Sequence, residues 1–514
     1  MRLILEGETM QSNERKDGTL TRRRFIAAGG AGAAGLAIGG WALGRATASS
    51  EPVRADLVLR PRPSEVEIGG RQVATWTYDG GLPGPAVRLR QGRPVRIRVD
   101  NDLPEPTTVH WHGIRLREND ADGVPGLTQT AIEPGGSYMY EFTPPDAGTF
   151  FFHSHVGMQL DRGLYAPLIV EATDETLDYD REAVLILDDW LDGVRGTPDE
   201  QLEALRSEGM AHGMGGMGPA PGEPFGPVRG PRPSPGVAMA NLALAGGVDA
   251  GDVDHPLHLI NGRPPEAPFQ VDVRRGQSVR LRFVNAAADT IYAVFVEGHE
   301  LRVTHADGLA VEPVTTDALL MGMAERFDAL IEPRGEGGAR VIAVPLGKAG
   351  RAVANLRLAD SRARTPAPDA PVRPPRRLLT HADLTGAEME EATPRGDRRT
   401  IDMSLAMDMR EPYLWSIGGQ SMEGSDEVQI ARDEPVRFVF ANRTMMPHPM
   451  HLHGHSFRPV RRGEGLAPLK DTILVAPMET LAVDWTADNP GDWALHCHNG
   501  YHHEAGMMRH IKVA

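Results

Sequence analysis

The sequence predicts an all-β protein of three β-sandwich domains, and three observations carry that prediction. The chain has 514 residues, more than one hydrophobic core usually serves. Its 58 glycines and 42 prolines favour many turns and short strands. A fifteen-residue pattern of alternating apolar positions recurs three times at domain-sized intervals. A duplicated β-domain accounts for all three observations.

The recurring pattern is VRLRQGRPVRIRVDN at residues 87–101, VDVRRGQSVRLRFVN at 271–285 and VQIARDEPVRFVFAN at 428–442. Each copy contains an alternating run, a polar turn and a second alternating run that ends in asparagine. Alternation predicts two half-buried strands joined by a tight turn. The spacing predicts a repeated domain and not a short-period solenoid. We place the sandwiches at about 51–175, 180–360 and 375–514.

The first 48 residues have the features of a twin-arginine export signal. TRRRFI at 21–26 precedes a weakly apolar stretch at 27–43, and Ala46, Thr47 and Ala48 supply a small-residue cleavage site. The alternative is an uncleaved membrane anchor, which the weak hydrophobicity and the nearby A-x-A pattern disfavour. We expect the twin-arginine machinery as an export partner and a periplasmic or extracellular location.

Two segments of unusual composition interrupt or join the predicted sandwiches. Residues 207–237 are rich in Gly, Pro and Met and are predicted to form a mobile excursion from the middle domain. Residues 361–377 are rich in proline and are predicted to connect to the last domain. A helix is predicted only locally, at 198–208.

Charge and cysteine content exclude several classes of protein. The formal net charge of -16 argues against a nucleic-acid partner, because binding to phosphates needs a basic surface. Cys497 is the only cysteine, so the chain has no internal disulfide framework. Its thiol therefore needs a different explanation.

Many of the 19 histidines fall in four compact groups: HWH (His110, His112), HSH (His153, His155), HPMHLHGH (His448, His451, His453, His455) and HCHNGYHH (His496, His498, His502, His503). In a strand, residues i and i+2 point to the same face, so each H-x-H pair presents two imidazoles side by side. Such pairs predict metal sites with several ligands. Isolated histidines, such as His299 and His305, are expected to be solvated or packed in the core.

The ligand types favour copper. One Cys with two His and a weak axial Met describes a blue-copper electron-transfer site, and Cys497, His502 and Met507 lie at offsets of five and ten residues. One more histidine is required from elsewhere. A structural zinc site is the alternative, but it normally draws more cysteines. His496 and His498 should point to the opposite face of the strand from Cys497, so the backbone can join two metal centres.

The groups HWHG, HSH, HPMHLHGH and HCHNGYHHEAGM resemble the four copper-binding signatures of the multicopper oxidases, a family that includes laccases, cuprous oxidases and copper-resistance oxidases. The stretches DGLA, AERFDALI and LDDW resemble the family's middle domain. The resemblance covers essentially the whole chain after the signal. It implies three cupredoxin-like Greek-key β-sandwich domains and four copper ions as cofactors.

The resemblance also implies which residues bind each copper. The ligands would be His448, Cys497, His502 and Met507 for the single type 1 copper, His110 and His451 for the type 2 copper, and His112, His153, His155, His453, His496 and His498 for the two type 3 coppers. His455 is not expected to be a ligand. The middle domain would act as a spacer without copper, and the trinuclear group would form between the first and last domains.

The implied reaction is the one-electron oxidation of a reductant at the type 1 copper, coupled to the four-electron reduction of dioxygen to water. Asp122 matches an acidic residue that the family uses near the oxygen site. Some bacterial members have Glu directly after the later type 1 histidine. Here His503 holds that position, and Glu504, which follows it, is the candidate second proton donor.

The reductant is predicted from methionines, whose thioethers prefer Cu(I). Met210, Met214 and Met217 could collect cuprous ions for a copper-protective cuprous oxidase; if not, they belong only to a flexible loop. The first alternative is a laccase that oxidises phenols or aromatic amines. A copper-storage protein without turnover is the second alternative, but it would not need a complete oxygen-reducing group. One chain supplies every ligand, so a monomer suffices.

Overall fold

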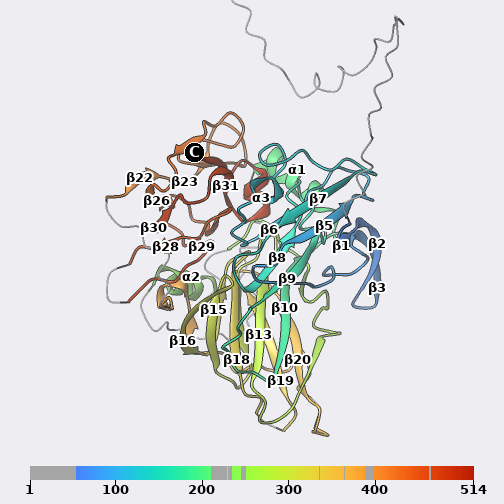
Figure 1. Ribbon diagram of the computed structural model, residues 1–514. Helices are drawn as coiled ribbons and strands as arrows, with labels where there is room; N and C mark the ends of the chain where they lie inside the picture. Colours follow the sequence, from blue (N-terminus) through green and yellow to red (C-terminus); the bar gives the residue numbers. More distant parts are fainter. Residues whose placement is uncertain are drawn as a thin grey trace, which may run out of the picture. The chain divides into compact units, whose positions relative to one another are not determined.

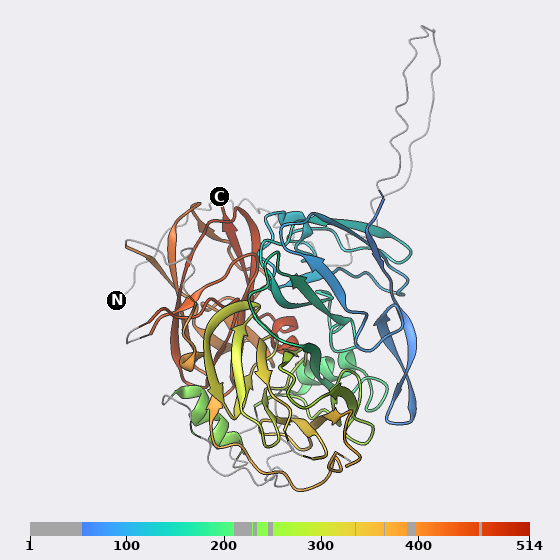
Figure 2. The same ribbon diagram turned by 60° about the horizontal axis from the view of Figure 1, so that its bottom comes forward.

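The computed structural model describes residues 54–209, 229, 234–244, 250–334, 336–363, 365–387, 397–461 and 465–514. Strands predominate among these residues and helices are few, which confirms the predicted all-β class. The predicted export signal lies outside the described residues, as does most of the predicted excursion at 207–237. None of the described helices is long and apolar enough to cross a membrane. Figures 1 and 2 show three groups of strands, blue to teal, green to yellow, and orange to red.

The first region, residues 57–171, contains a four-stranded sheet, a three-stranded sheet and a separate antiparallel pair. Its elements are β1 (Leu57–Leu59), β2 (Pro61–Ile68), β3 (Arg71–Tyr78), β4 (Val87–Arg90), β5 (Val95–Asp100), β6 (His110–His112), η2 (Asn119–Ala121), β7 (Ser137–Phe142), β8 (Gly148–His153) and β9 (Tyr165–Glu171). Strand β6 is at the edge of the larger sheet and pairs with β8. That pairing places His110 opposite His153.

The middle region, residues 181–379, contains two six-stranded sheets, of order β11-β10-β13-β18-β15-β16 and β12-β20-β19-β14-β17-β21. Its elements are β10 (Arg181–Trp190), α1 (Pro198–Glu208), α2 (Pro235–Leu244), β11 (Leu257–Ile260), β12 (Phe269–Val273), β13 (Val279–Asn285), β14 (Tyr292–Val296), β15 (Leu301–Ala306), β16 (Leu309–Thr316), β17 (Ala318–Met321), β18 (Arg326–Ile331), β19 (Ala339–Pro345), β20 (Ala352–Leu358) and β21 (Leu378–Leu379). Buried residues from both sheets form one hydrophobic core.

The last region, residues 399–513, contains a five-stranded sheet, β25-β32-β31-β27-β29, a four-stranded sheet, β22-β26-β30-β28, and a two-stranded pair. After η5 (His381–Asp383), its elements are β22 (Arg399–Asp402), β23 (Leu405–Asp408), β24 (Leu414–Ile417), β25 (Val428–Ile430), β26 (Pro435–Ala441), β27 (His448–Leu452), β28 (Arg458–Pro459), β29 (Thr472–Val475), β30 (Thr480–Thr486), β31 (Gly491–Cys497), α3 (Gly500–Glu504) and β32 (Met508–Val513). Strands β27 and β31 are neighbours, with His451 opposite His496.

The two strands of each repeated pattern belong to different sheets. Strands β4 and β5, β12 and β13, and β25 and β26 are each joined by a tight turn, but no pair is hydrogen-bonded as a hairpin. The turn therefore carries the chain from one layer of a sandwich to the other. This explains why both runs alternate, since each layer buries one face against the other.

The asparagine that ends each repeat has the same structural role in all three copies. Asn101, Asn285 and Asn442 are buried. In each case the side-chain Oδ1 accepts a hydrogen bond from the backbone N–H two residues later, and Nδ2 donates to loop carbonyls. Asn101 and Asn442 thereby shape the loops that lead into His110 and His448.

The local helix predicted at 198–208 is confirmed as α1. Thr197 and Glu200 form a reciprocal capping box: Thr197 Oγ1 accepts from the Glu200 N–H at 3.2 Å and Glu200 Oε2 accepts from the Thr197 N–H at 2.9 Å. Leu202 and Leu205 of this helix pack into the hydrophobic core of the last region. A second helix, α2, begins inside the Gly-, Pro- and Met-rich segment and was not predicted.

Asp192, just after β10, joins the middle region to the first. Its Oδ2 accepts a hydrogen bond from Thr75 Oγ1 at 2.7 Å, and burial raises the pKa of Asp192 to about 6 from 3.8.

The folded protein therefore binds the Asp192 proton more tightly than the unfolded chain, so the free energy of unfolding should fall as pH rises from 3.8 to about 6, by roughly 2–3 kcal/mol. Asp192→Asn should lack this loss. Urea titrations of both proteins across this pH range test it, and parallel pH profiles would contradict it.

Candidate metal centres

A cysteine, two histidines and a methionine of the last region form a buried group. Cys497 Sγ lies 3.6 Å from Nδ1 of His502 and 3.7 Å from Nδ1 of His448, and the two Nδ1 atoms are 3.1 Å apart. Met507 is also fully buried. Its backbone N–H donates to the His502 carbonyl, and its carbonyl accepts from the Cys497 N–H, both at 3.0 Å. The structure therefore brings together the side chains of His448, Cys497 and His502, and backbone hydrogen bonds join Met507 to two of these residues.

The short helix α3 carries His502 to this group. Asn499 caps it, because Oδ1 accepts hydrogen bonds from the N–H groups of Tyr501 and His502. Asn499 Nδ2 in turn donates to Asp289 Oδ1 of the middle region at 2.6 Å. The position of His502 thus depends on a polar contact with another region.

A threonine holds the outer nitrogen of His448. The Thr444 hydroxyl donates to Asn442 Oδ1 at 2.8 Å, so its oxygen is left to accept a hydrogen bond from His448 Nε2 at 2.9 Å. The hydrogen of this ring is therefore on Nε2, and Nδ1 presents a lone pair toward Cys497.

A carboxylate from the middle region holds the outer nitrogen of His502. Asp252 Oδ2 accepts from His502 Nε2 at 2.7 Å and from the Tyr413 hydroxyl at 2.6 Å. Burial lowers the pKa of His502, but the Asp252 carboxylate outweighs it and raises the pKa to about 10. A metal at Nδ1 must therefore displace a proton, while the proton on Nε2 stays with Asp252. The ring of Trp415 covers His502, with centroids 4.0 Å apart.

Eight further histidines converge from two pairs of neighbouring strands. They are His110 and His112 on β6, His153 and His155 on and after β8, His451 and His453 on and after β27, and His496 and His498 on and after β31. All eight are buried. The Nε2 atoms of His453 and His496 are 3.0 Å apart, and those of His153 and His498 are 3.3 Å apart. Each end of the chain thus supplies four imidazoles.

The hydrogen bonds of these rings show that the group suits a metal. The outer nitrogens of six rings have oxygen partners: His110 (Asp122 O), His451 (Asp471 O), His153 (Ser154 O), His496 (Cys497 O), His453 (Asp122 Oδ2) and His112 (Thr472 Oγ1). Four inner nitrogens have no hydrogen-bond partner: His110 Nε2, His112 Nδ1, His155 Nε2 and His451 Nε2. A ring that donates outward is neutral and directs a lone pair inward.

Burial reinforces the neutral state of these imidazoles. Desolvation, together with the neighbouring imidazoles, holds the pKa of His112, His153 and His155 well below the ordinary value, and the same holds for His453, His496 and His498. Metal binding requires deprotonated imidazole. The residues present therefore fit the copper group that the sequence implied.

Asp122 lies on the outer side of this group. Its Oδ2 accepts from His453 Nδ1 at 2.8 Å, and its backbone carbonyl accepts from His110 Nδ1 at 2.7 Å. Asp122 is itself buried, and its Oδ1 has no hydrogen-bond partner. One residue thus holds a ring from each end of the chain.

Glu504 does not contact the eight imidazoles in the described contacts, whereas its neighbour His503 does. The rings of His155 and His496 lie 4.8 and 4.6 Å from the His503 ring, measured between centroids. Glu504 Oε1 lies 3.6 Å from Nδ1 of His503. His503 thus lies near both Glu504 and the imidazole group.

A cavity of about 30 Å³ opens beside the imidazole group. Its lining includes His155, His496 and His503 together with Gly157 and Gly500. This volume holds about one or two water molecules.

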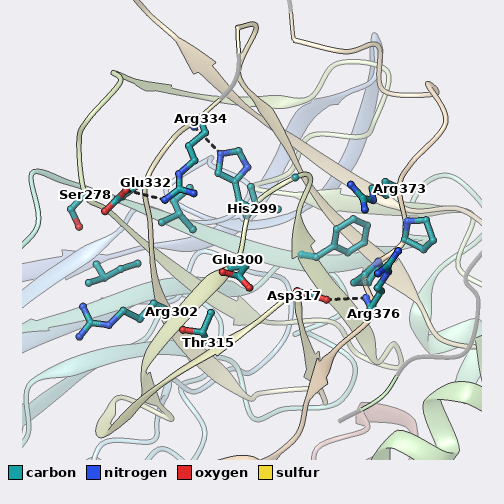
Figure 3. A pocket seen from close by; sticks show the side chains of 17 residues that line it. Ser278, His299, Glu300, Arg302, Thr315, Asp317, Glu332, Arg334, Arg373 and Arg376 are labelled. Atoms are coloured by element: carbon teal, nitrogen blue, oxygen red, sulfur yellow. Dashed lines mark hydrogen bonds and ion pairs between the residues drawn. The ribbon is translucent and has the colours of Figure 1, made fainter. Parts of the chain in front are cut away.

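A larger cavity lies elsewhere, on the middle region, with a volume of about 610 Å³. Figure 3 shows that arginines and acids both line it, among them Arg302, Arg373, Glu300 and Asp317. None of its lining residues belongs to either histidine group. Its mixed charge favours no single class of ligand.

Three of the remaining sequence predictions, Met210, Met214 and Met217, lie outside the described residues. His455 packs against the rings of Trp485 and Trp493, at centroid distances of 4.8 and 5.6 Å. Two functional residues were not predicted from the sequence. Asp252 Oδ2 accepts from Nε2 of His502, and the Asp471 carbonyl accepts from Nδ1 of His451.

Comparison with known proteins decides the family. Residues 62–175, 239–356 and 395–514 each match a family model described as multicopper oxidase. The chain belongs to the multicopper oxidase family. It is therefore an oxidoreductase, and the family's cofactor set is four copper ions: one type 1, one type 2 and two type 3.

Several multicopper oxidases resemble the chain over most of its length. Multicopper oxidase MmcO of Mycobacterium tuberculosis is 37% identical, with 88% of this chain and 86% of the relative aligned. Copper resistance protein A of Escherichia coli is 29% identical, with 93% and 96% aligned. The solved multi-copper oxidase of Pseudomonas thermotolerans is 27% identical, covers 90% of this chain and 100% of its own, and has a TM-score of 0.65. The laccase of Botrytis aclada has a TM-score of 0.72 at 24% identity over 89% and 87%, which shows the shared multicopper oxidase fold.

Proposed function

We propose that this multicopper oxidase is exported and oxidises Cu(I), which protects against copper, with dioxygen as the electron acceptor. The placement of Cys497 carries the oxidase assignment. Its Sγ lies with His448 and His502, while its neighbours His496 and His498 belong to the eight-imidazole group. One covalent segment therefore joins a site for electron entry to a site for oxygen.

The proposed ligands are His448, Cys497, His502 and Met507 for type 1 copper, His110 and His451 for type 2, and His112, His153, His155, His453, His496 and His498 for type 3. When bound, the coppers supply one-electron redox chemistry and the reduction of dioxygen. The protein orients the rings, excludes bulk water and holds protons at Asp122 and Glu504. The oxygen partners of these rings face outward and the nitrogens without a partner face inward.

Exposed methionines support Cu(I) as the reductant. Four of the six exposed large hydrophobic side chains in the described residues are methionines of the last region: Met409, Met422, Met445 and Met478. The Met478 N–H donates to the Thr444 carbonyl at 3.2 Å, so Met445 and Met478 belong to adjoining loops. Thr444 in turn contacts His448. Two soft thioethers, those of Met445 and Met478, thus belong to loops that adjoin a residue in contact with His448.

The relatives support the same reductant. Both a copper resistance protein A and a multicopper oxidase share most of their length with this chain. The laccase alternative, with phenols as reductants, needs access to His502. Here His502 is fully buried, and Asp252 and Trp415 cover it. Met210, Met214 and Met217 follow α1 in the chain and are proposed as further Cu(I) ligands.

Oxygen consumption with Cu(I) and with a phenol tests the proposed function. Uptake with Cu(I), reduced when residues 210–217 are deleted, supports a cuprous oxidase; uptake with phenol alone supports a laccase. No uptake with either donor would leave a copper-storage protein. Export is tested separately, because the N-terminal sequence of the secreted protein should begin after Ala48.

A double substitution, Met445→Leu with Met478→Leu, should raise KM for Cu(I) by about three- to tenfold and leave kcat unchanged, because it removes soft donors and keeps apolar bulk. KM for a phenol should not change. Met139→Leu is the control, since Met139 is a half-buried methionine of the first region. An equal rise in KM for both donors, or for the control, would contradict a role in Cu(I) delivery.

A further inference from the structure

We propose that Arg326, on β18 of the middle region, is a positioning residue for the trinuclear copper group. Acting through Asp471 and Thr472, it determines which nitrogen of His112 and of His451 faces the coppers. The inference rests on the proposed ligands, which assign these two histidines to different coppers. It gives the middle region a role in orienting proposed copper ligands, beyond that of a spacer.

The first step is a fork of hydrogen bonds between two buried charges. Arg326 Nη1 donates to Asp471 Oδ1 at 2.7 Å, and Nη2 donates to Oδ2 at 2.5 Å. Arg326 and Asp471 are both buried. A bidentate pair fixes the plane of the carboxylate as well as its position.

The second step is a chain of hydrogen bonds from the oriented Asp471 carboxylate through Thr472 to His112. The Thr472 hydroxyl donates to Asp471 Oδ1 at 2.8 Å, so its only hydrogen is used. Its oxygen must then accept from His112 Nε2, which is 3.1 Å away. The hydrogen of His112 is therefore on Nε2, and Nδ1, which has no hydrogen-bond partner, presents a lone pair inward.

The third step concerns His451. Its Nδ1 donates to the backbone carbonyl of Asp471 at 2.9 Å and also lies 3.1 Å from Thr472 Oγ1, which leaves Nε2 bare. The Asp471 carboxylate also lies 3.3 Å from His112 Nε2 and 3.5 Å from His451 Nδ1. Without Arg326 the carboxylate could rotate away from Thr472 Oγ1, and the Thr472 hydroxyl could then donate to a ring nitrogen instead of accepting from it. The fork prevents that rotation, so the same nitrogen of each ring stays directed toward the copper group.

Arg326 contacts all three regions: its Nε donates to the Thr149 carbonyl of the first region at 3.4 Å, and Ala324 and Asp471 belong to the middle and last regions. Arg326 Nη1 also donates to the Ala324 carbonyl at 3.0 Å, and Asp307 Oδ1 lies 3.6 Å away. Asp307 Oδ2 accepts from the Thr472 N–H at 3.2 Å and pairs with Lys470 at 2.9 Å. Buried ion pairs add little net stability compared with apolar packing. A specific role in orientation therefore explains this cluster better than stability does.

The test compares two buried Arg–Asp pairs whose arginines both belong to the middle region. Arg326→Gln breaks the fork. Arg280→Gln is the matched control, because Arg280 donates to Asp328 at 2.6 and 2.9 Å, both residues are buried, and neither has a described contact with the proposed copper ligands. Apo-protein unfolding should show a comparable loss of stability in both variants. Copper-loaded protein is then titrated with a chelator while the paramagnetic resonance signal of type 2 copper is recorded.

Arg326→Gln should lower the affinity for type 2 copper by roughly 10- to 100-fold and change its resonance parameters, while the blue absorption of type 1 copper is kept. Arg280→Gln should change neither. Equal copper release and identical signals in the two variants would overturn the proposal. If Arg326→Gln does not fold, Thr472→Val leaves the charges intact and should still weaken type 2 copper; an unchanged affinity there would also overturn it.

Discussion

Replacing Cys497 with Ser is expected to remove the blue absorption of the type 1 copper and to lower oxygen consumption with either donor below about 1% of the original rate. A hydroxyl is a poor substitute for a thiolate as a copper ligand. Cys497 also lies between His496 and His498, so under the proposed function the substitution should block electron entry and leave the imidazole group in place. Absorption spectra and an oxygen electrode measure both effects.

The trinuclear group provides the internal control for this substitution. Cys497→Ser should keep the resonance signal of type 2 copper, because Asp122 and Asp471, and not Cys497, hold the proposed type 2 ligands His110 and His451. Retention of the blue absorption would refute the proposed type 1 ligand. Loss of both signals would instead indicate a folding defect.

Gly113→Ala is expected to destabilise the folded protein by about 3–5 kcal/mol, the usual effect of breaking a buried ion pair. Gly113 follows His112 and has φ of +84°. A Cβ atom there would lie 2.7 Å from Asp471 Oδ2 and would collide with the Arg326 guanidinium. The glycine of HWHG therefore leaves room for the fork between Arg326 and Asp471. Urea unfolding of the apo protein measures the loss.

Gly126→Ala is the control that separates the effect of the side-chain collision from the effect of backbone strain. Gly126 has φ of +76°, and a Cβ atom there would meet nothing within 4 Å. Gly126→Ala should therefore lower the free energy of unfolding by only about 1–2 kcal/mol, the cost of placing an alanine in the left-handed backbone conformation. Similar losses at Gly113 and Gly126 would show that the fork does not depend on the glycine.

The local chemistry of the metal centres could be predicted from the sequence because it depends on spacing within strands. Each H-x-H pair directs two rings to one face of its strand, and Cys497 alternates with His496 and His498. The repeated asparagines could be recognised, but their role could not. Only the structure shows that Asn442 and Thr444 together determine which nitrogen of His448 is free.

The outer contacts of the metal centres could not be predicted, because they join residues far apart in the chain. Arg326 and Asp471 are 145 positions apart, and Asp252 and His502 are 250 apart. A charged residue in a sequence is ordinarily solvated, and nothing in its immediate neighbours reveals a buried partner in another region. The pair Lys470 and Asp471 beside the apolar run of β29 was the one local signal.

The small volume of the cavity beside His155 and His496 limits which molecules can enter it. At about 30 Å³ it admits dioxygen or water but no aromatic reductant. An aromatic donor is therefore expected to stay outside this cavity, and under the proposed function its electrons would reach the imidazole group through Cys497. A wider cavity would bring such a donor into direct contact with the imidazoles. The small volume thus favours the entry of electrons over the entry of whole donor molecules at the proposed oxygen site.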